Sequence, residues 1–189
     1  MSFLAVPDPA AARRFFLARS GLMLSGAAVA LLAGKDVLAA RSGGDGAADA
    51  DILNTALASE HEAVAAYQAG AESGLLQKPV LDLALKFQGH HKAHADVLAG
   101  TVTRLGGRPV AAKAKYAFPL ETLKSQDDVL RFAAGLERGA VSAYVGAVPL
   151  FAERDLSRAA ATILADEAMH WAVLRQALGQ DPVPGAFIG

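Results

Sequence analysis

The chain has 189 residues, of which 53% are hydrophobic and 20% charged, so it is long enough to bury the core of one domain. Its net charge of -1 provides no basic surface of the kind that nucleic-acid-binding proteins use, and the absence of cysteine excludes disulfides and thiolate metal sites. Alanine dominates the composition and only 6% of the residues are aromatic, which favours helices over strands and predicts an all-α fold.

The first predicted element is a targeting segment. Arg13 and Arg14 precede an uncharged stretch, 21–34, that is rich in leucine, alanine and valine. This stretch of about 14 residues is shorter than the roughly 20 that a stable membrane-spanning helix needs, and small residues near Ala39 offer a cleavage site. Residues 1–40 therefore resemble a twin-arginine signal peptide, and the resemblance implies export to the periplasm or beyond with no stable membrane anchor. The alternatives are an uncleaved membrane anchor and a frayed amphipathic N-terminus.

Four helices are predicted within residues 51–179. In these segments apolar residues recur at steps of three and four, as a helix with one buried face requires. Glycines end the first, second and fourth helices, a proline lies near the end of the third, another proline opens the second, and a serine followed three residues later by an aspartate caps the third. The predicted helices are 51–73, 79–105, 125–152 and 155–178, preceded by a linker at 41–50 and followed by a tail at 180–189.

The connections between these helices differ in length. Residues 106–125 form a connection of about 20 residues with little periodicity, whereas the other two connections are short turns. A connection of that length can cross the whole length of a bundle. The pattern predicts two antiparallel hairpins joined by a long crossover, and it argues against an up-and-down bundle with short loops throughout.

The two predicted hairpins repeat one arrangement of ionisable side chains. In each hairpin the first helix carries a glutamate, and the second carries two ionisable residues that are three apart and share a helix face. At a rise of about 1.5 Å per residue, all of them lie at the same depth from the turn. We expect six side chains to converge and hold a metal ion, because a buried acidic cluster is too unfavourable without a cation. These residues are Glu60, His91, His94, Glu137, Glu167 and His170.

Other polar side chains near this level have simpler interpretations. Tyr67 and Tyr144 each follow a glutamate by seven residues, on the same inward face. They are candidates to hydrogen-bond the glutamates, with packing in the core as the alternative. His61 and His90 fall off the inward face, and we expect both of them to be solvated.

The repeated glutamate and tyrosine, together with the Glu167-x-x-His170 pattern, resemble the ferritin, bacterioferritin and rubrerythrin superfamily over residues 51–179. The resemblance implies a ferritin-like four-helix bundle with a carboxylate-bridged site for two metal ions. It assigns Glu60 and Glu137 as single ligands of their helices. His91 departs from the pattern because it stands where the family has a bridging glutamate. Losing that bridge and its charge predicts weaker binding of a second metal ion.

These inferences predict an exported metal-binding protein that takes one or two transition-metal ions, with iron the first candidate and manganese or zinc the alternatives. The resemblance implies a metal-dependent oxidoreductase acting on dioxygen, peroxide or ferrous iron. The competing prediction is a non-enzymatic bundle that buffers metal, or a stress-related structural protein with a degenerate site. Metal ions and the twin-arginine export machinery are the expected partners, nucleic acid is not, and self-association into a homo-oligomer stays open.

Overall fold

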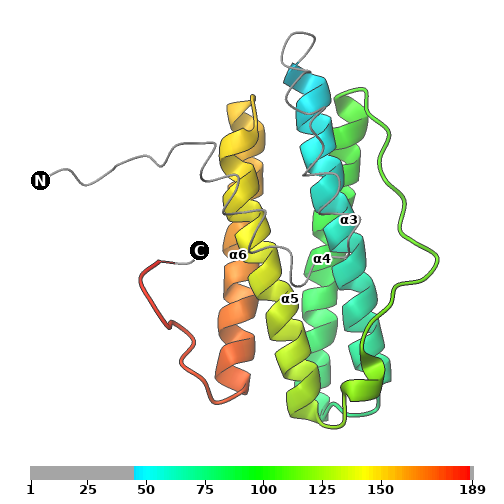
Figure 1. Ribbon diagram of the computed structural model, residues 1–189, viewed down its shortest axis with the longest axis vertical. Helices are drawn as coiled ribbons and strands as arrows, with labels where there is room; N and C mark the ends of the chain where they lie inside the picture. Colours follow the sequence, from blue (N-terminus) through cyan, green and yellow to red (C-terminus); the bar gives the residue numbers. More distant parts are fainter. Residues whose placement is uncertain (1–44, 188–189) are drawn as a thin grey trace, which may run out of the picture.

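The computed structural model describes residues 45–187, and these residues form a bundle of four long helices (Figure 1). Within this described part there is no strand, so the predicted all-α class is confirmed. The predicted signal peptide at 1–40 lies outside the described residues. The elements are α3 (Asp45–Glu72), α4 (Lys78–Arg104), η3 (Leu120–Thr122), α5 (Gln126–Ala147), η4 (Val148–Leu150) and α6 (Arg154–Ala177).

The predicted signals for the ends of the helices act as expected. Pro79 lies in the first turn of α4, where no backbone N–H is needed. The Ser125 hydroxyl accepts a hydrogen bond from the backbone N–H of Asp128 at 3.2 Å and so caps α5. Gly74 and Gly179 follow α3 and α6 with φ angles of 72° and 68°, which a glycine adopts without steric cost.

The start of α3 differs from the prediction. The helix begins at Asp45, so most of the segment predicted to be a linker at 41–50 is helical. Asp49 is buried, and its carboxylate accepts hydrogen bonds from the N–H groups of Ala152 and Glu153 at 2.9 and 3.2 Å. This contact ties α3 to the turn that begins α6, where backbone N–H groups need partners. The sequence did not reveal it because Ala152 lies 103 residues away along the chain.

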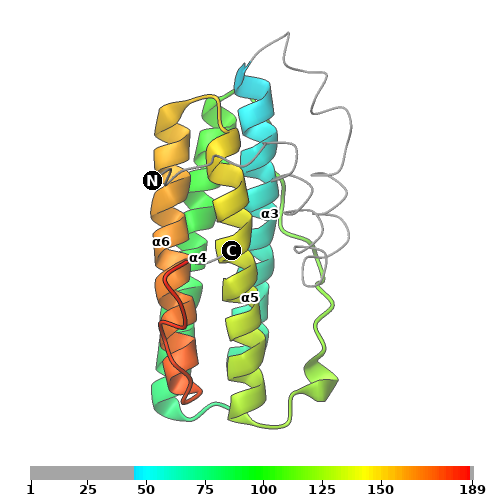
Figure 2. The same cartoon turned by 60° about the vertical axis from the view of Figure 1, so that its left-hand side comes forward.

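The two hairpin turns lie at opposite ends of the bundle. The backbone N–H of Gln77 donates to the Gln126 side chain at 2.9 Å, so the turn between α3 and α4 lies beside the start of α5. At the other end, the bonds of Asp49 place the turn between α5 and α6 beside the start of α3. Helices α3 and α5 are therefore antiparallel, and the crossover runs the length of the bundle to connect α4 with α5 (Figures 1 and 2).

The crossover is fastened to α3 by side chains. The amide of Asn54 donates to the carbonyl of Arg108 at 3.0 Å and accepts from the N–H of Val110 at 2.8 Å. Nε2 of His61 lies 3.2 Å from the carbonyl oxygen of Val110. His61 is thus half-buried against the crossover, a contact that the sequence did not predict.

Two apolar clusters fill the interior, one toward each end of the bundle. The first is built around Leu57 and Val102 and lies toward the turn between α5 and α6. The second is built around Phe87, Leu130 and Trp171 and lies toward the turn between α3 and α4. Each cluster contains one tyrosine, Tyr144 in the first and Tyr67 in the second, and the level between the clusters is polar.

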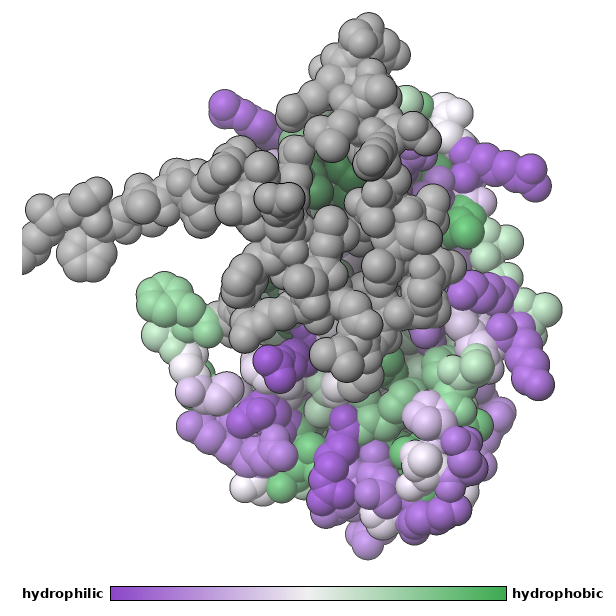
Figure 3. All heavy atoms as spheres, in the orientation of Figure 1, coloured by the Kyte–Doolittle hydropathy of each residue, from purple (hydrophilic) through white to green (hydrophobic). Residues whose placement is uncertain are grey.

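The outer surface of the bundle is mixed in hydropathy. On the part of the face that Figure 3 shows uncovered, hydrophilic side chains are interspersed with apolar ones. Among residues 45–187, none of the helices combines the length and the apolar character that crossing a bilayer would require.

Candidate metal centre

Six ionisable side chains meet in the polar level between the two apolar clusters. All four long helices contribute, and five of the six side chains are fully buried while His94 retains slight exposure. The convergence predicted from the repeat is confirmed, and metal binding stays a prediction. The six residues are Glu60 of α3, His91 and His94 of α4, Glu137 of α5, and Glu167 and His170 of α6.

The reason for this convergence differs from the one predicted. Depth was counted from each hairpin turn, but the turns lie at opposite ends of the bundle (Figure 1). The heights still agree because the six residues lie near the middle of their helices, and the middle is equally far from both ends. The predicted long crossover itself places the two turns at opposite ends, so the six residues share one level because each lies near the middle of its helix.

The ligand atoms fall into two overlapping groups, and within each group they lie within 4.8 Å of one another. Oε1 of Glu167 lies 3.0 Å from Nδ1 of His94, and its Oε2 lies 3.6 Å from Nδ1 of His170. Glu167 thus stands between the groups, as a bridging carboxylate would. Glu60 and His94 belong to the first group, Glu137 and His170 to the second, and His91 and Glu167 to both.

His91 takes the second central position. Its Nδ1 lies 2.8 Å from Oε2 of Glu60 and its Nε2 lies 3.2 Å from Oε1 of Glu137. Burial would lower the pKa of His91, but its hydrogen bonds to Glu137 and Glu60 outweigh burial and raise the pKa to about 11. At neutral pH the imidazole of the metal-free protein is therefore charged, and it serves as an internal cation between two carboxylates.

The other two histidines of the centre are charged for the same reason. Burial would lower the pKa of His94, but Glu167 and Glu60 raise it to about 9. Likewise, burial would lower the pKa of His170, but Glu137 and Glu167 raise it to about 9. Without a bound cation, three imidazolium groups thus balance the carboxylates at neutral pH.

The three glutamates respond differently to the same surroundings. Burial would raise the pKa of Glu137 and Glu60, but hydrogen bonds from the histidines hold both below the usual value. For Glu167 burial prevails, and its pKa lies above the usual value. Glu60 and Glu137 therefore stay ionised in the centre, and Glu167 is the carboxylate that protonates most easily.

The two tyrosines hydrogen-bond the glutamates in a crossed pattern. The hydroxyl of Tyr144 on α5 donates to Oε1 of Glu60 on α3 at 2.7 Å, and the hydroxyl of Tyr67 on α3 donates to Glu137 on α5. Each tyrosine lies two helical turns, about 10.5 Å, from the glutamate of its own helix, and the antiparallel helices place the two tyrosines on opposite sides of the polar level. Each side chain points back toward the N-terminus of its helix and so reaches the glutamate of the other helix. Burial and the adjacent carboxylate raise the pKa of both hydroxyls, which keeps them protonated as donors.

Two residues of this region were not among the predicted ligands. Oδ2 of Asp166 lies 3.3 Å from Nε2 of His94 and 3.3 Å from Nε2 of His170, and such contacts leave the Nδ1 atoms facing the centre. Nδ1 of His90 lies 2.9 Å from the same carboxylate, so this partly exposed histidine also has a contact that the sequence did not predict. The available signal was spacing, since His90 precedes His94, and Asp166 precedes His170, by one helical turn.

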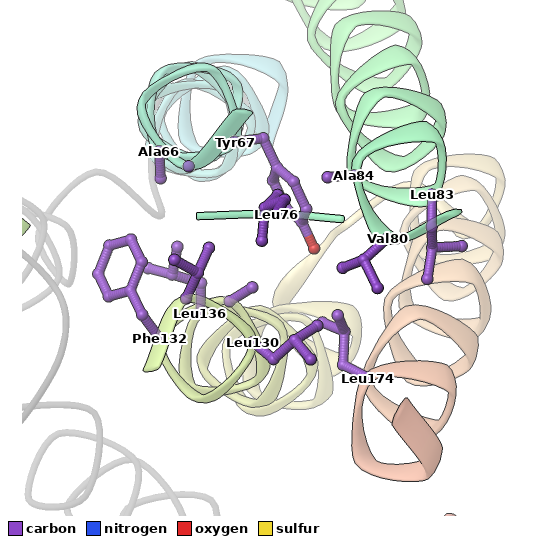
Figure 4. Close-up of a pocket in the computed structure, with 13 residues that line it drawn as sticks. Ala66, Tyr67, Leu76, Val80, Leu83, Ala84, Leu130, Phe132, Leu136 and Leu174 are labelled. Carbon is purple, nitrogen blue, oxygen red and sulfur yellow. The ribbon is translucent and has the colours of Figure 1, made fainter. Parts of the chain in front are cut away.

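An apolar pocket lies on one side of the centre, toward the turn between α3 and α4. Its lining includes Val80, Leu83, Leu130 and Leu174, and Figure 4 shows Tyr67 reaching from α3 into the space among them. Because the Tyr67 hydroxyl bonds Glu137, this ring separates the pocket from the polar level. The pocket suits small apolar molecules better than charged ones.

The donor set fits a transition-metal ion. Buried polar atoms without a partner are unfavourable, and native proteins contain few of them. Five buried nitrogen and oxygen atoms of this centre complete no hydrogen bond among the described residues, although Nδ1 of His94 and Oε1 of Glu167 lie 3.0 Å apart as an ion pair. A mixed set of imidazole and carboxylate donors suits iron, manganese and zinc. The five atoms are Nδ1 of His94, Nδ1 of His170, Oε2 of Glu137, and Oε1 and Oε2 of Glu167.

Comparisons with known proteins agree with this architecture. A family described as the ferritin-like domain matches residues 48–180. Among solved structures, the chain is similar to a conserved hypothetical protein from Mycobacterium tuberculosis, with 26% identity and a TM-score of 0.66 over 76% of this chain and 99% of that one. A comparison with curated proteins gives no match.

Proposed function

The chain belongs to the ferritin-like domain family, and from that premise we propose that its buried glutamate and histidine centre binds one or two transition-metal ions. Iron is the first candidate, and manganese and zinc are the alternatives. The observation that carries the proposal is the set of five buried donor atoms that complete no hydrogen bond within the described part of the chain, all of which belong to the centre. Ligation by bound cations would supply the contacts that these atoms lack as hydrogen bonds.

The two overlapping groups support a site for two ions of unequal affinity. Glu167 is placed to contribute one oxygen to each ion, as a bridging carboxylate does. His91 occupies the other shared position, and a neutral imidazole brings no negative charge to the pair of ions. Three carboxylates then face two divalent cations, so the first ion binds more tightly than the second.

A second candidate function follows from the charge balance of the metal-free centre. The hydrogen bonds of His91 to Glu60 and Glu137 provide a cation without any metal. A structural bundle with a degenerate site would rely on this ion cluster alone. Thermal unfolding with and without a chelator separates the two candidates. A metal-binding centre gives a large chelator-dependent drop in Tm, and a structural ion cluster gives none.

Metal binding is expected to release protons. A nitrogen that carries a proton cannot ligate, and the pKa values of about 9 for His94 and His170 and about 11 for His91 keep all three protonated at pH 7. Raising the pH toward 9 weakens this competition at His94 and His170, so the apparent affinity for Zn²⁺ should increase across that range. Calorimetric titration of the metal-free chain, in buffers that differ in ionisation enthalpy, measures the protons released. Binding without proton release would place the metal elsewhere.

We extend the proposal to redox chemistry on dioxygen, peroxide or ferrous iron, as the family resemblance implies. The apolar pocket beside Tyr67 supports this extension, because a small apolar molecule such as dioxygen would bind there next to the centre, with only the Tyr67 ring between. Loading the chain with Fe²⁺ under argon and then admitting air tests this extension. Oxidation that the chain accelerates supports an oxidoreductase, whereas slow oxidation with reversible Fe²⁺ release supports a metal buffer.

We also propose that the protein is exported through the twin-arginine machinery. Arg13 and Arg14 carry this proposal, and both lie outside the described residues. Replacing both arginines by lysine should leave the precursor in the cytoplasm, because lysine keeps the charge but loses the planar guanidinium. Cell fractionation followed by immunoblotting reads the result, with Arg19→Lys as the control. Normal export of the double variant would reject the assignment.

A further inference from the structure

A separate group of ligand atoms lies on the outer side of the centre, between α4 and α6. Nδ1 of His90 lies 2.9 Å from Oδ2 of Asp166 and 2.9 Å from Nε2 of His170. Nε2 of His170 lies 3.3 Å from the same Asp166 oxygen. Two imidazole nitrogens and one carboxylate oxygen thus form a triangle. We call His90, Asp166 and His170 the outer trio.

Hydrogen bonds alone do not account well for the close approach of the polar atoms in the outer trio. Where the nitrogens of His90 and His170 face each other, one of them must be unprotonated for a hydrogen bond to form. Both nitrogens also converge on a single oxygen of Asp166, together with Nε2 of His94 at 3.3 Å. Zinc binds nitrogen and oxygen donors at about 2.1 Å, so a tetrahedral site separates its donors by about 3.4 Å. The observed separations need to widen only slightly to admit such a cation.

The outer trio connects the surface with the buried centre. The side chain of His90 is 36% exposed, that of Asp166 is 21% exposed and that of His170 is 2% exposed. Inside the centre, the Glu167 side chain, 3.6 Å from Nδ1 of His170, is 0% exposed. A buried metal centre needs a route from solvent, and this series of ligand side chains provides one.

His170 belongs to both sites through different atoms. Its Nε2 faces the outer trio, whereas its Nδ1 lies 3.5 Å from Glu137 and 3.6 Å from Glu167 inside the centre. An ion held by the outer trio is therefore adjacent to the ligands of the second group. Both ends of this imidazole are placed to bind a cation.

We propose that His90, Asp166 and His170 form an outer transition-metal site that takes up a divalent cation from solvent and delivers it to the buried centre. The delivery step rests on the proposed function of that centre, whereas binding at the outer trio does not. His90 is the residue specific to the outer site, because Asp166 also contacts His94 and His170 also faces the centre.

Cobalt uptake by the full-length, metal-free chain tests the delivery step. Stopped-flow absorbance follows the visible Co²⁺ bands as the buried centre fills. His90→Phe keeps a planar ring and removes the donor nitrogen. We expect it to slow filling by about tenfold or more while the final occupancy of the buried centre stays as in wild type. His61→Phe is the matched control, since it removes a half-buried histidine of α3 that is not part of the outer trio. The buried centre of this variant should fill at the wild-type rate.

The outcomes separate this inference from the proposed function. If His90→Phe fills as fast as wild type, the delivery step is wrong and the metal centre stands. If wild type takes up no Co²⁺ in the buried centre, the proposed function fails and delivery fails with it. Binding at the outer trio is then judged from ¹⁵N spectra of the histidine rings during Zn²⁺ titration. A shift of the His90 Nδ1 signal that Asp166→Asn abolishes supports the outer site, and an unmoved signal overturns it.

Discussion

Glu167→Gln is expected to abolish tight binding at both metal positions. Glu167 is the carboxylate that both groups of ligand atoms share, with one oxygen directed to His94 and the other to His170. The amide keeps the size of the side chain but removes the negative charge and one oxygen donor. We expect the affinity for each ion to fall by about two orders of magnitude. Calorimetric titration with Zn²⁺, together with elemental analysis, measures the loss.

Two further substitutions give this experiment its controls. Glu60→Gln and Glu137→Gln each change one group only, so each should cost one ion and leave the other bound. Glu121→Gln changes an exposed glutamate in η3 and should bind as wild type does. The shared role of Glu167 is contradicted if Glu167→Gln retains one tight ion, or if its effect equals that of Glu60→Gln.

His91→Glu is expected to destabilise the metal-free protein and to make its stability depend on bound metal. In the metal-free protein His91 carries a positive charge between Glu60 and Glu137. A glutamate at this position places a fourth carboxylate in a dry interior and removes the internal cation. Breaking a buried ion pair in this way costs about 3–5 kcal/mol. The metal-free variant should therefore unfold at much lower denaturant concentration, whereas the metal-loaded variant should bind two ions and recover its stability.

His91→Gln separates charge from shape in this test. It removes the cation without adding an anion, so the metal-free stability should lie between those of wild type and His91→Glu.

The stability of the metal-free wild type is also expected to depend on pH. Folding raises the pKa of His91 from 6.5 to about 11. The contribution of His91 to the free energy of unfolding is therefore complete below pH 6.5 and is lost as the pH rises through about 11. Equal metal-free stability of wild type and His91→Glu would show that His91 is not the counter-charge.

Local patterns in the sequence were sufficient for most of the fold. The apolar period of a helix, the glycines after α3 and α6 and the cap at Ser125 predicted the helices, because these signals act within a few residues. They failed at the start of α3. There a segment whose composition is typical of linkers is helical, and the buried Asp49 accepts hydrogen bonds from a turn that is distant in the sequence.

The candidate centre shows the same division. Six convergent side chains, and the departure at His91, followed from the sequence because a helix has a fixed rise and fixed faces. The crossed bonds of the tyrosines did not follow, since they depend on α3 and α5 being antiparallel. Nor did the contacts of His90 with Asp166, which depend on the distance between α4 and α6.

The sequence by itself thus determined which side chains lie at one level on which face of each helix. Only the tertiary structure decided which helix faces which and in what direction, and hence which side chains touch. The physical reason is that rise and periodicity are properties of a single helix. By contrast, the contacts of Tyr67, Tyr144 and Asp166 depend on how separate helices pack, which the whole buried core determines.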